Sequence, residues 1–297
     1  MSRLVGFLVG VVLLGTLSCT TREEPLGSEG NPIKLHFVPS QEAKVLSDNS
    51  KILKKYLEEH TPYKFSVTIP QSYITVVEAF GTKRADVSAL NTFGYILAHE
   101  RYGAEARLTV VRYGSPNYQS QILAKADSNI KTIEDLQGKR VAFVDPASTS
   151  GYLLPLKALR DRGIKPFKTV FAMKHDSVIS MIYQGQVDAG ATFYTPPVNG
   201  KMDDARRLVL HQYPDVEEKI KIVALTEPIP NDPIVFRKDI SEGMKTKIIA
   251  AFVSFVATPE GKKALDSIYG ATDFKTVTDA DYAVVREMLQ EARKLNK

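Results

Sequence analysis

The segment GKRVAFVDPASTSGY, Gly138–Tyr152, carries the pattern that decides the fold. Its unbroken apolar run, Val141 to Val144, is typical of a strand buried on both faces. A short turn rich in hydroxyl groups follows, and leucines at positions 153, 156 and 159 then repeat with helical spacing. The pattern predicts a strand that leads through a tight turn into a helix, as in an α/β protein.

The turn in this segment also predicts an anion site. At a helix start the first N–H groups lack intrahelical partners, and the helix dipole places partial positive charge there. Ser148, Thr149 and Ser150 add hydroxyl donors, and Gly151 would let a ligand approach the backbone closely. These groups can replace the hydration of a tetrahedral oxyanion without a buried cation. Serine and threonine are also ordinary helix N-caps, so the triplet alone leaves a purely structural role open.

The chain on both sides of this segment alternates between strand and helix patterns. Apolar and polar residues alternate over 33–38 and 65–69, whereas 42–60 and 74–80 show helical spacing. A second α/β series begins near Ser120, and the tail from Ile240 onward is mostly helical. Strands separated by helices predict an α/β body with a largely parallel sheet.

The N-terminus has the pattern of an export signal. Arg3 precedes an apolar run from Leu4 to Leu14, and small residues lead to Cys19. The run is shorter than the roughly 20 residues that a membrane span requires, so we expect cleavage of a signal peptide, 1–18. Cys19 is the only cysteine of the chain, which excludes an intrachain disulfide. The polar, Gly- and Pro-containing stretch 19–32 predicts a flexible tether, with the folded body beginning near Ile33.

Composition and motifs argue against several classes of function. The 297 residues, 43% hydrophobic and 25% charged, indicate a globular chain, and removal of Arg3 with the signal changes the net charge from +5 to +4. The basic residues form no block, which argues against nucleic acid as a partner. No Gly-x-x-x-x-Gly-Lys or Gly-x-Ser-x-Gly pattern and no metal-ligand spacing is present, so we expect no cofactor and no metal. Adjacent His175 and Asp176 cannot readily form a triad with Ser150, so we expect no enzyme activity.

The stretch Ala142–Tyr152 resembles the signature of the phosphonate-binding protein family, the periplasmic components of phosphate, phosphite and phosphonate ABC importers. Further segments resemble that family in the same order along the chain: 130–138, His175-Asp176, 185–189, 229–233 and 278–282. Thr16-Leu17-Ser18-Cys19 resembles a bacterial lipobox, although Thr16 stands where leucine is usual. Lipidation of Cys19 is the expectation, and a chance cysteine beside an ordinary signal peptide stays open as the alternative.

The resemblance implies a two-lobe periplasmic-binding-protein fold of the type II kind, with a ligand cleft between lobes joined by a two-strand hinge. Lobe 1 would comprise 33–122 plus 223–297, and lobe 2 would comprise 123–222. The two chain crossings of the hinge would lie near 120–124 and 224–233. Periodicity alone does not locate such a hinge.

The resemblance also implies the site residues. The hydroxyls of Ser148, Thr149 and Ser150 would hold the phosphorus oxygens together with the helix-end amides. Tyr73 would reach the ligand from the first lobe, and Tyr118 would form a second aromatic wall. His175, with Asp176, would face the ligand; a solvated Lys-His-Asp surface loop is the alternative.

The implied function is capture of a phosphorus oxyanion, that is a phosphonate, phosphite or phosphate, for an ABC permease and ATPase. Family members that bind aminoalkyl phosphonates carry a carboxylate about twenty positions after the histidine, where this chain reads TFYTPP at 192–197. That difference argues against an aminophosphonate, unless Asp232 compensates. We expect a monomeric, membrane-anchored lipoprotein at the periplasmic or extracellular face. A sensory module of the same fold, and a sulfonate, sulfate or organic anion as the ligand, remain alternatives.

Overall fold

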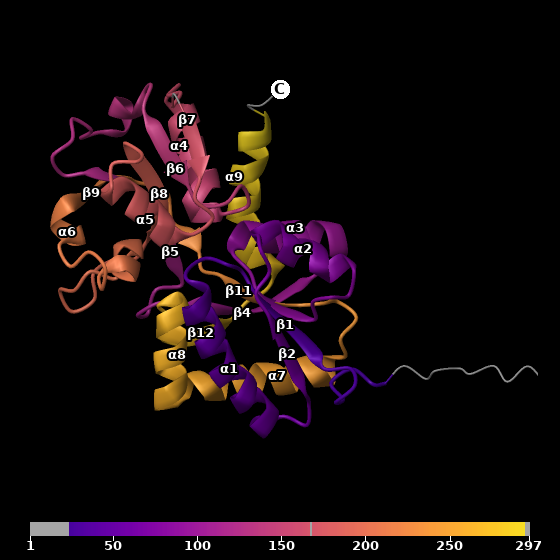
Figure 1. Cartoon of the computed structure of the whole chain (residues 1–297). Helices are drawn as coiled ribbons and strands as arrows, with labels where there is room; N and C mark the ends of the chain where they lie inside the picture. The colour runs from indigo at the N-terminus through magenta and orange to yellow at the C-terminus, as the bar shows by residue number, and fades with distance from the viewer. Residues whose placement is uncertain (1–23, 167, 295–297) are drawn as a thin grey trace, which may run out of the picture.

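The computed structural model describes residues 24–166 and 168–294, and their strands form two separate sheets (Figure 1). Each sheet has six strands, and helices pack on both, so the predicted α/β character is confirmed. The expectation of a largely parallel sheet is wrong, because six of the ten strand pairings in the described residues are antiparallel. The expected signal peptide, 1–18, and Cys19 lie outside the described residues. Among the helices of the described part, none has both the length and the apolar composition needed to cross a membrane.

The first sheet combines both ends of the described chain, in the order β12-β4-β11-β3-β1-β2. Its strands are β1 (Ile33–Phe37), β2 (Phe65–Thr68), β3 (Val87–Ala89), β4 (Glu105–Val111), β11 (Pro233–Phe236) and β12 (Asp273–Thr276). Its helices are α1 (Ala43–His60), α2 (Tyr73–Gly81), α3 (Thr92–Tyr102), α7 (Glu242–Ala257), α8 (Pro259–Tyr269) and α9 (Ala283–Lys294), with a 3-10 turn η4 (Asp279–Tyr282). β1 is parallel to β2 and β3, whereas β11 is antiparallel to β3 and β4.

The second sheet is built from the middle of the chain, in the order β10-β5-β8-β6-β7, and β9 also pairs with β5. Its strands are β5 (Asn117–Lys125), β6 (Arg140–Phe143), β7 (Lys168–Phe171), β8 (Ala189–Tyr194), β9 (Ile220–Leu225) and β10 (Ile229–Pro230). The helical segments are η1 (Ile133–Leu136), η2 (Thr149–Leu153), α4 (Leu154–Asp161), α5 (His175–Tyr183), η3 (Ala205–Val209) and α6 (Val216–Lys219). β6 is parallel to β7 and β8 and lies inside the sheet.

The apolar run that decides the fold is β6 and the residue after it. Val141 to Val144 are at most 1% exposed, and Phe143 contacts the rings of Tyr152 and Phe171. Burying one such side chain stabilises the fold by about 1.5–3 kcal/mol. The strand is therefore held firmly, and the residues that follow it have a fixed starting point.

Residues 24–32 are folded, although the sequence places them in the flexible tether. Gly27 donates its N–H to the Asn31 carbonyl at 2.7 Å and accepts from the Lys64 N–H at 2.8 Å. Leu26 packs against the apolar core of the first sheet, beside Tyr63. The polar composition of this segment does not predict that it is folded, because one of its hydrogen bonds joins it to Lys64, more than thirty positions away.

The chain passes between the two sheets twice. The first crossing is a tight turn in which the Arg112 and Ser115 backbones exchange hydrogen bonds, and Tyr113 and Gly114 have φ of 47° and 82°. Two consecutive positive φ angles are typical of a type I′ turn. Asn231 forms the second crossing and donates its N–H to the Pro116 carbonyl at 2.9 Å. The boundaries expected at 122/123 and 222/223 fall inside β5 and β9, which pair with each other.

Candidate functional site: a polar cavity between the two sheets

A cavity of about 50 Å³ lies between the two sheets and takes residues from both. At roughly 10–15 Å³ for each water-sized group, it has room for about three to five such groups. It is lined by Val38, Ser40, Gln41, Tyr73, Asn91, Arg112, Tyr118, Ser148, Thr149, Ser150, His175, Phe193, Arg207, Leu208, Asp232, Ile268 and Tyr269. The size fits a small tetrahedral ion.

The hydroxyl-rich turn forms one wall of this cavity, and local hydrogen bonds fix its shape. The Asp145 carboxylate accepts from the Ala147 N–H at 2.7 Å, and the Ser148 Oγ accepts from the Gly151 N–H at 3.0 Å. Ser148, Thr149 and Ser150 are each at most 3% exposed. The turn continues as η2, one widened helical turn, before α4 begins at Leu154, rather than as the α-helix expected from about residue 151.

Gly151 is needed for a different reason from the one expected. A Cβ at this position would lie 2.3 Å from Cγ2 of Val144, which is closer than any real carbon contact. The absent side chain therefore lets η2 pack on the end of β6. This packing sets where the hydroxyls stand, whereas the sequence suggested that the glycine makes space for the ligand.

Thr149 connects the two halves of the molecule. Its Oγ1 accepts from the Phe93 N–H at 2.9 Å and from Asn91 Nδ2 at 3.0 Å, both at the start of α3 in the first half. Asn91 Nδ2 also donates to the Ala147 carbonyl at 2.8 Å. A threonine hydroxyl has one proton and two lone pairs, so the Thr149 proton remains available for a ligand.

Two buried tyrosines stand at the same cavity. Tyr73 begins α2 and Tyr118 lies on β5, at 2% and 4% exposure. Burial, and then the negative charge of Asp145 for Tyr73 and of Asp232 for Tyr118, raises the pKa of both phenols well above its usual range. Both hydroxyls are therefore protonated at neutral pH and can donate to an anion.

His175 lines the cavity as a neutral ring. Burial, with a smaller contribution from the positive charge of Arg112, lowers the pKa of His175 to about 3. Its Nδ1 is buried without a hydrogen-bond partner, and its backbone N–H donates across the halves to the Ser40 carbonyl at 3.0 Å. A neutral imidazole has one N–H, so it offers an anion a single donor.

Asp176 does not line the cavity. It borders a separate hollow together with Glu42 and His211, and its carboxylate accepts from the Ser177 N–H at 2.9 Å. Because Asp176 is the second residue of α5, its side chain leaves the helix in a different direction from that of His175. The other six expected site residues line one cavity, and Asp176 stands apart from them.

Arg112 is a buried cation that sequence reasoning missed. The sequence suggested that the turn could hold an oxyanion without such a cation, whereas this guanidinium lines the cavity at 6% exposure. It donates to the Tyr269 carbonyl at 2.7 Å and to Asp232 Oδ2 at 3.0 Å, and its Cζ lies 4.6 Å from the ring centroid of Tyr118. Arg112 follows directly after β4 in the sequence, and no motif or spacing marks it as a site residue.

Asp232 brings a carboxylate into the lining of the cavity. Burial raises the pKa of the Asp232 carboxyl above its usual value, although the neighbouring Arg112 opposes part of this rise. Its Oδ2 is paired with Arg112, and its Oδ1 is buried without a partner. The sequence indicated Asp232 either as a ligand residue or as a plain turn former, and the structure places it at the cavity.

Unpartnered polar atoms gather around the cavity. Among the described residues, five of its lining side chains have a buried atom without a hydrogen bond: Asn91 Oδ1, His175 Nδ1, Arg207 Nε, Asp232 Oδ1 and the Tyr269 hydroxyl. Buried polar groups in folded proteins are nearly always paired, and leaving one unpaired costs about 1–3 kcal/mol. The cluster therefore indicates a polar ligand that completes these bonds.

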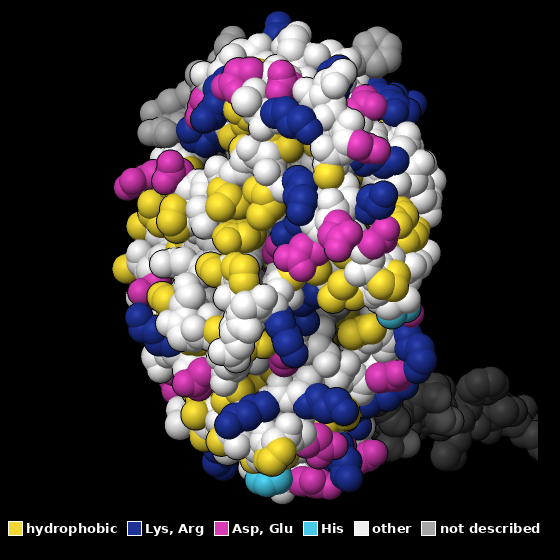
Figure 2. All heavy atoms as spheres, turned by 90° about the vertical axis from the view of Figure 1, so that its left-hand side faces the viewer, with side chains coloured by type: hydrophobic (Ala, Val, Ile, Leu, Met, Phe, Trp, Pro, Cys, Tyr) yellow, Lys and Arg dark blue, Asp and Glu magenta, His cyan; other side chains and the backbone are white. Residues whose placement is uncertain are grey.

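The lysine and arginine residues on the molecular surface do not mark a binding site. On the face shown in Figure 2, lysine and arginine side chains are interspersed with acidic and apolar ones. Two cations, Arg112 and Arg207, line the cavity, where solvent screens charges less than it does at the surface. In residues 24–166 and 168–294 no group of three or more His, Cys, Asp or Glu side chains is placed to hold a metal.

Comparisons with known proteins agree with this architecture. Residues 35–282 match the model of a family described as ABC transporter, phosphonate, periplasmic substrate-binding protein. The chain is 33% identical to the phosphate-import protein PhnD of Mycolicibacterium smegmatis over 203 residues, 62% of this chain and 63% of that protein. It is 27% identical to the phosphonates-binding periplasmic protein of Escherichia coli over 240 residues, 78% of this chain and 68% of that protein.

A solved structure shares the fold. PhnD1 of Prochlorococcus marinus, in complex with methylphosphonate, superposes with a TM-score of 0.75 at 22% identity, over 89% of this chain and 98% of that one. The predicted two-lobe periplasmic-binding-protein fold is confirmed by this similarity. The match to the family model covers most of the described residues, including the whole hydroxyl-rich turn and both sheets except for the first two residues of β1. The chain therefore belongs to the family of periplasmic substrate-binding proteins of phosphonate ABC transporters.

Proposed function

We propose that this protein captures a small phosphorus oxyanion, that is a phosphonate, phosphite or phosphate, and delivers it to an ABC permease and ATPase. The observation that carries this proposal is the 50 Å³ cavity with its hydroxyl donors and its cluster of unpartnered polar atoms. An anion bound there exchanges its water shell for fixed donors, which require little reorganisation. The proposed role is binding without catalysis, because Asp176 is not placed to orient His175 as a base.

The ligand contacts follow from the lining of the cavity. The hydroxyls of Ser148, Thr149 and Ser150 hold the oxyanion from the second sheet, and Tyr73, Tyr118 and His175 donate around it. Arg112 supplies the positive charge, and Asp176 takes no part. The small volume and the absence of a carboxylate over 192–197 argue for a ligand without an aminoalkyl chain.

Asp232 favours phosphorus over sulfur. Phosphate, phosphite and phosphonate can each retain a proton near neutral pH, and that P–OH group can donate to the free Oδ1 of Asp232. Sulfate and sulfonates carry no such proton, so their lone pairs would face the carboxylate oxygen. An unpaired buried polar contact of this kind costs about 1–3 kcal/mol, which corresponds to roughly five- to 150-fold in affinity.

Closure of two lobes gives the mechanism. We place the crossings at 112–116 and 231–232, so that one lobe carries each sheet. In the open protein the anion meets the hydroxyl-rich turn first, and closure then forms the contacts of Thr149 with Phe93 and of His175 with Ser40. A few residues at the ends of β4 and β11 would absorb the rotation, as in hinge motions generally.

The location of the protein is part of the same proposal. The N-terminal pattern suggests export, with cleavage of 1–18 and a lipid on Cys19 that holds a monomeric protein at the membrane. The folded turns of residues 24–32 leave only a short segment after Cys19 as a possible tether.

Isothermal titration calorimetry tests the ligand class. We expect heat of binding with phosphate, phosphite or methylphosphonate, and at least tenfold weaker binding of 2-aminoethylphosphonate, sulfate and methanesulfonate. Methanesulfonate is the informative control, since it matches methylphosphonate in shape and lacks the proton. Tight binding of methanesulfonate, or no heat with any phosphorus anion, would exclude the proposed function.

A further inference from the structure

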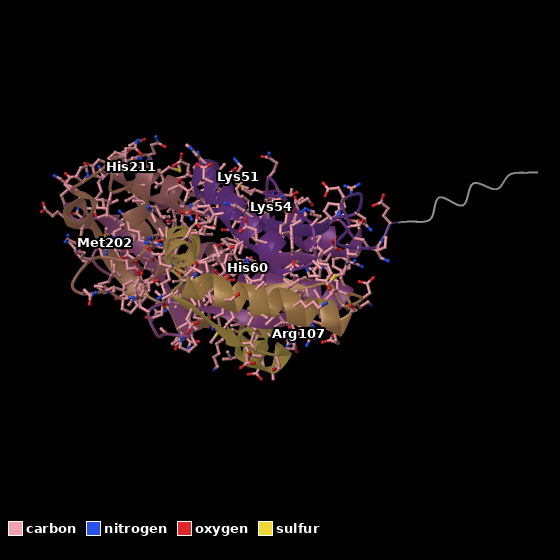
Figure 3. All side chains as sticks on the ribbon, turned by 90° about the horizontal axis from the view of Figure 1, so that it is seen from below. Lys51, Lys54, His60, Arg107, Met202 and His211 are labelled. Carbon is pink, nitrogen blue, oxygen red and sulfur yellow. The ribbon has the colours of Figure 1, made fainter. Side chains whose placement is uncertain are left out.

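Arg207 lines the anion cavity from the second lobe and also reaches the first lobe. It lies on η3, in the loop bracketed by Met202 and His211, which are labelled on the second-lobe side in Figure 3. Its Nη2 donates at 3.0 Å to the carbonyl of Asp266, in the last turn of α8. This hydrogen bond joins the two lobes.

The end of α8 is suited to receive a guanidinium group. The C-terminus of a helix carries partial negative charge, and a cation near its last carbonyls is stabilising. Gly270, at φ of 62°, caps the helix, and a Cβ on this residue would lie 3.3 Å from Nη2 of Arg207. The absent side chain therefore gives Arg207 room to approach the carbonyl of Asp266.

The other edge of the guanidinium has no hydrogen bond. Nε of Arg207 is buried without a partner, although Asp203 Oδ1 lies 3.5 Å away. Arg207 and Arg112 line the same small cavity, and each has one carboxylate beside it, Asp203 and Asp232 respectively. An anion bound in this cavity would be attracted by both guanidinium groups.

We propose that Arg207 is an anion-dependent latch, which binds the ligand with Nε and holds the lobes closed through its hydrogen bond to α8. The proposal rests on the proposed function for its ligand class. The latch forms after the anion has met the hydroxyl-rich turn, because the loop of Arg207 and α8 lie on different lobes. The latch therefore slows ligand release more than it speeds capture, as is usual for contacts completed late in binding.

Two variants test the latch. Arg207→Met removes the charge and the donors, and Arg207→Met with Asp203→Asn also removes the carboxylate that would be left unpaired. Arg162→Met is the matched control, because Arg162 is an exposed arginine of the second lobe that pairs with Glu134 at 3.5 Å and donates to the Ala158 carbonyl at 3.0 Å, within the same lobe. Inorganic phosphate and methylphosphonate are the probes, followed by stopped-flow tyrosine fluorescence, since the chain has 13 tyrosines and no tryptophan.

We expect both Arg207 variants to release the bound anion at least tenfold faster than the wild type, with an association rate within threefold, and Arg162→Met to behave as the wild type. The latch proposal would be contradicted if the double variant released the anion less than tenfold faster than the wild type. It would also be contradicted if the variants lost affinity because they bound the anion more slowly. The two proposals fail separately: a wild type that binds neither phosphate nor methylphosphonate refutes the proposed function, whereas normal release from the variants refutes only the latch.

Discussion

The hydroxyl group of Thr149 accepts two hydrogen bonds from the first lobe, and its own proton is the donor that the proposed function assigns to the ligand. We therefore expect Thr149→Ala to weaken binding of phosphate or methylphosphonate at least tenfold, because the Phe93 N–H and Asn91 lose their acceptor on closure. A loss of about 1–3 kcal/mol for such groups corresponds to this range. Calorimetry measures the change, and Ser150→Ala should act in the same direction.

The control for this pair is Thr246→Ala, an exposed threonine on α7. It removes the same atoms far from the cavity and should leave the affinity within twofold of the wild type. If Thr149→Ala and Ser150→Ala both bind as tightly as Thr246→Ala, the hydroxyl-rich turn is not the anion site.

His175 links the cavity to the pH dependence of stability. Its pKa of about 3 in the folded protein lies below the ordinary value of 6.5, so between these values the unfolded chain binds one more proton. Stability is therefore lost as pH falls below 6.5, by up to about 1.4 kcal/mol for each pH unit. We expect wild type to lose about 2 kcal/mol more than His175→Gln between pH 7 and pH 5, measured by urea unfolding.

His60→Gln provides the comparison, because His60 is exposed at the end of α1. This variant should keep the pH profile of the wild type. A His175→Gln profile parallel to that of wild type would show that the buried ring does not determine this part of the acid sensitivity.

At the scale of elements, the junction of β6 with η2 depends on a missing side chain. Gly151→Ala would place a Cβ 2.3 Å from Val144 and force the turn away from the strand. Overpacking of this kind costs about 1–3 kcal/mol, so we expect a lower free energy of unfolding and weaker anion binding together. Gly243→Ala is the matched control, because a Cβ there meets no atom within 4 Å in a helical position and should stabilise slightly. Equal stability of the two variants would contradict the packing argument.

The local sequence pattern predicted those site residues that lie close together in one segment of the chain. The run 141–144 and the three hydroxyl residues 148–150 lie within ten residues of one another, so the strand and the turn follow from local pattern, whereas the place of the turn at the ligand site was implied by the family resemblance. Arg112 and Asp232 are 120 positions apart and meet only because β4 and β11 pair at the crossing. Arg207 reaches α8 from a loop without periodicity. Such residues are placed by tertiary contacts that spacing along the chain does not encode.

Asp176 illustrates the limit of reasoning by adjacency. The sequence paired it with His175, but successive residues at a helix start point about 100° apart, so only one of the two can face the cavity. The folded segment 24–32 shows a similar limit, since its partners lie near Lys64. In both places the residue types could be interpreted, but the sequence did not predict where the Asp176 side chain points or where the segment 24–32 packs.

At the scale of the whole molecule, the cavity is enclosed only because both lobes contribute to it, so binding should change the distance between them. Glu42 and Gln184 are exposed, border the same hollow and lie on different lobes. We expect spin labels on Glu42→Cys and Gln184→Cys, in mature protein with Cys19→Ser, to give a shorter and narrower distance distribution when phosphate or methylphosphonate is added. Labels on Glu42→Cys and Lys51→Cys, which are both on or beside α1, should show no change. An unchanged Glu42–Gln184 distance at saturating ligand would mean that the anion enters without hinge closure, since a rotation of the lobes about the crossings at 112–116 and 231–232 must move these two positions relative to each other.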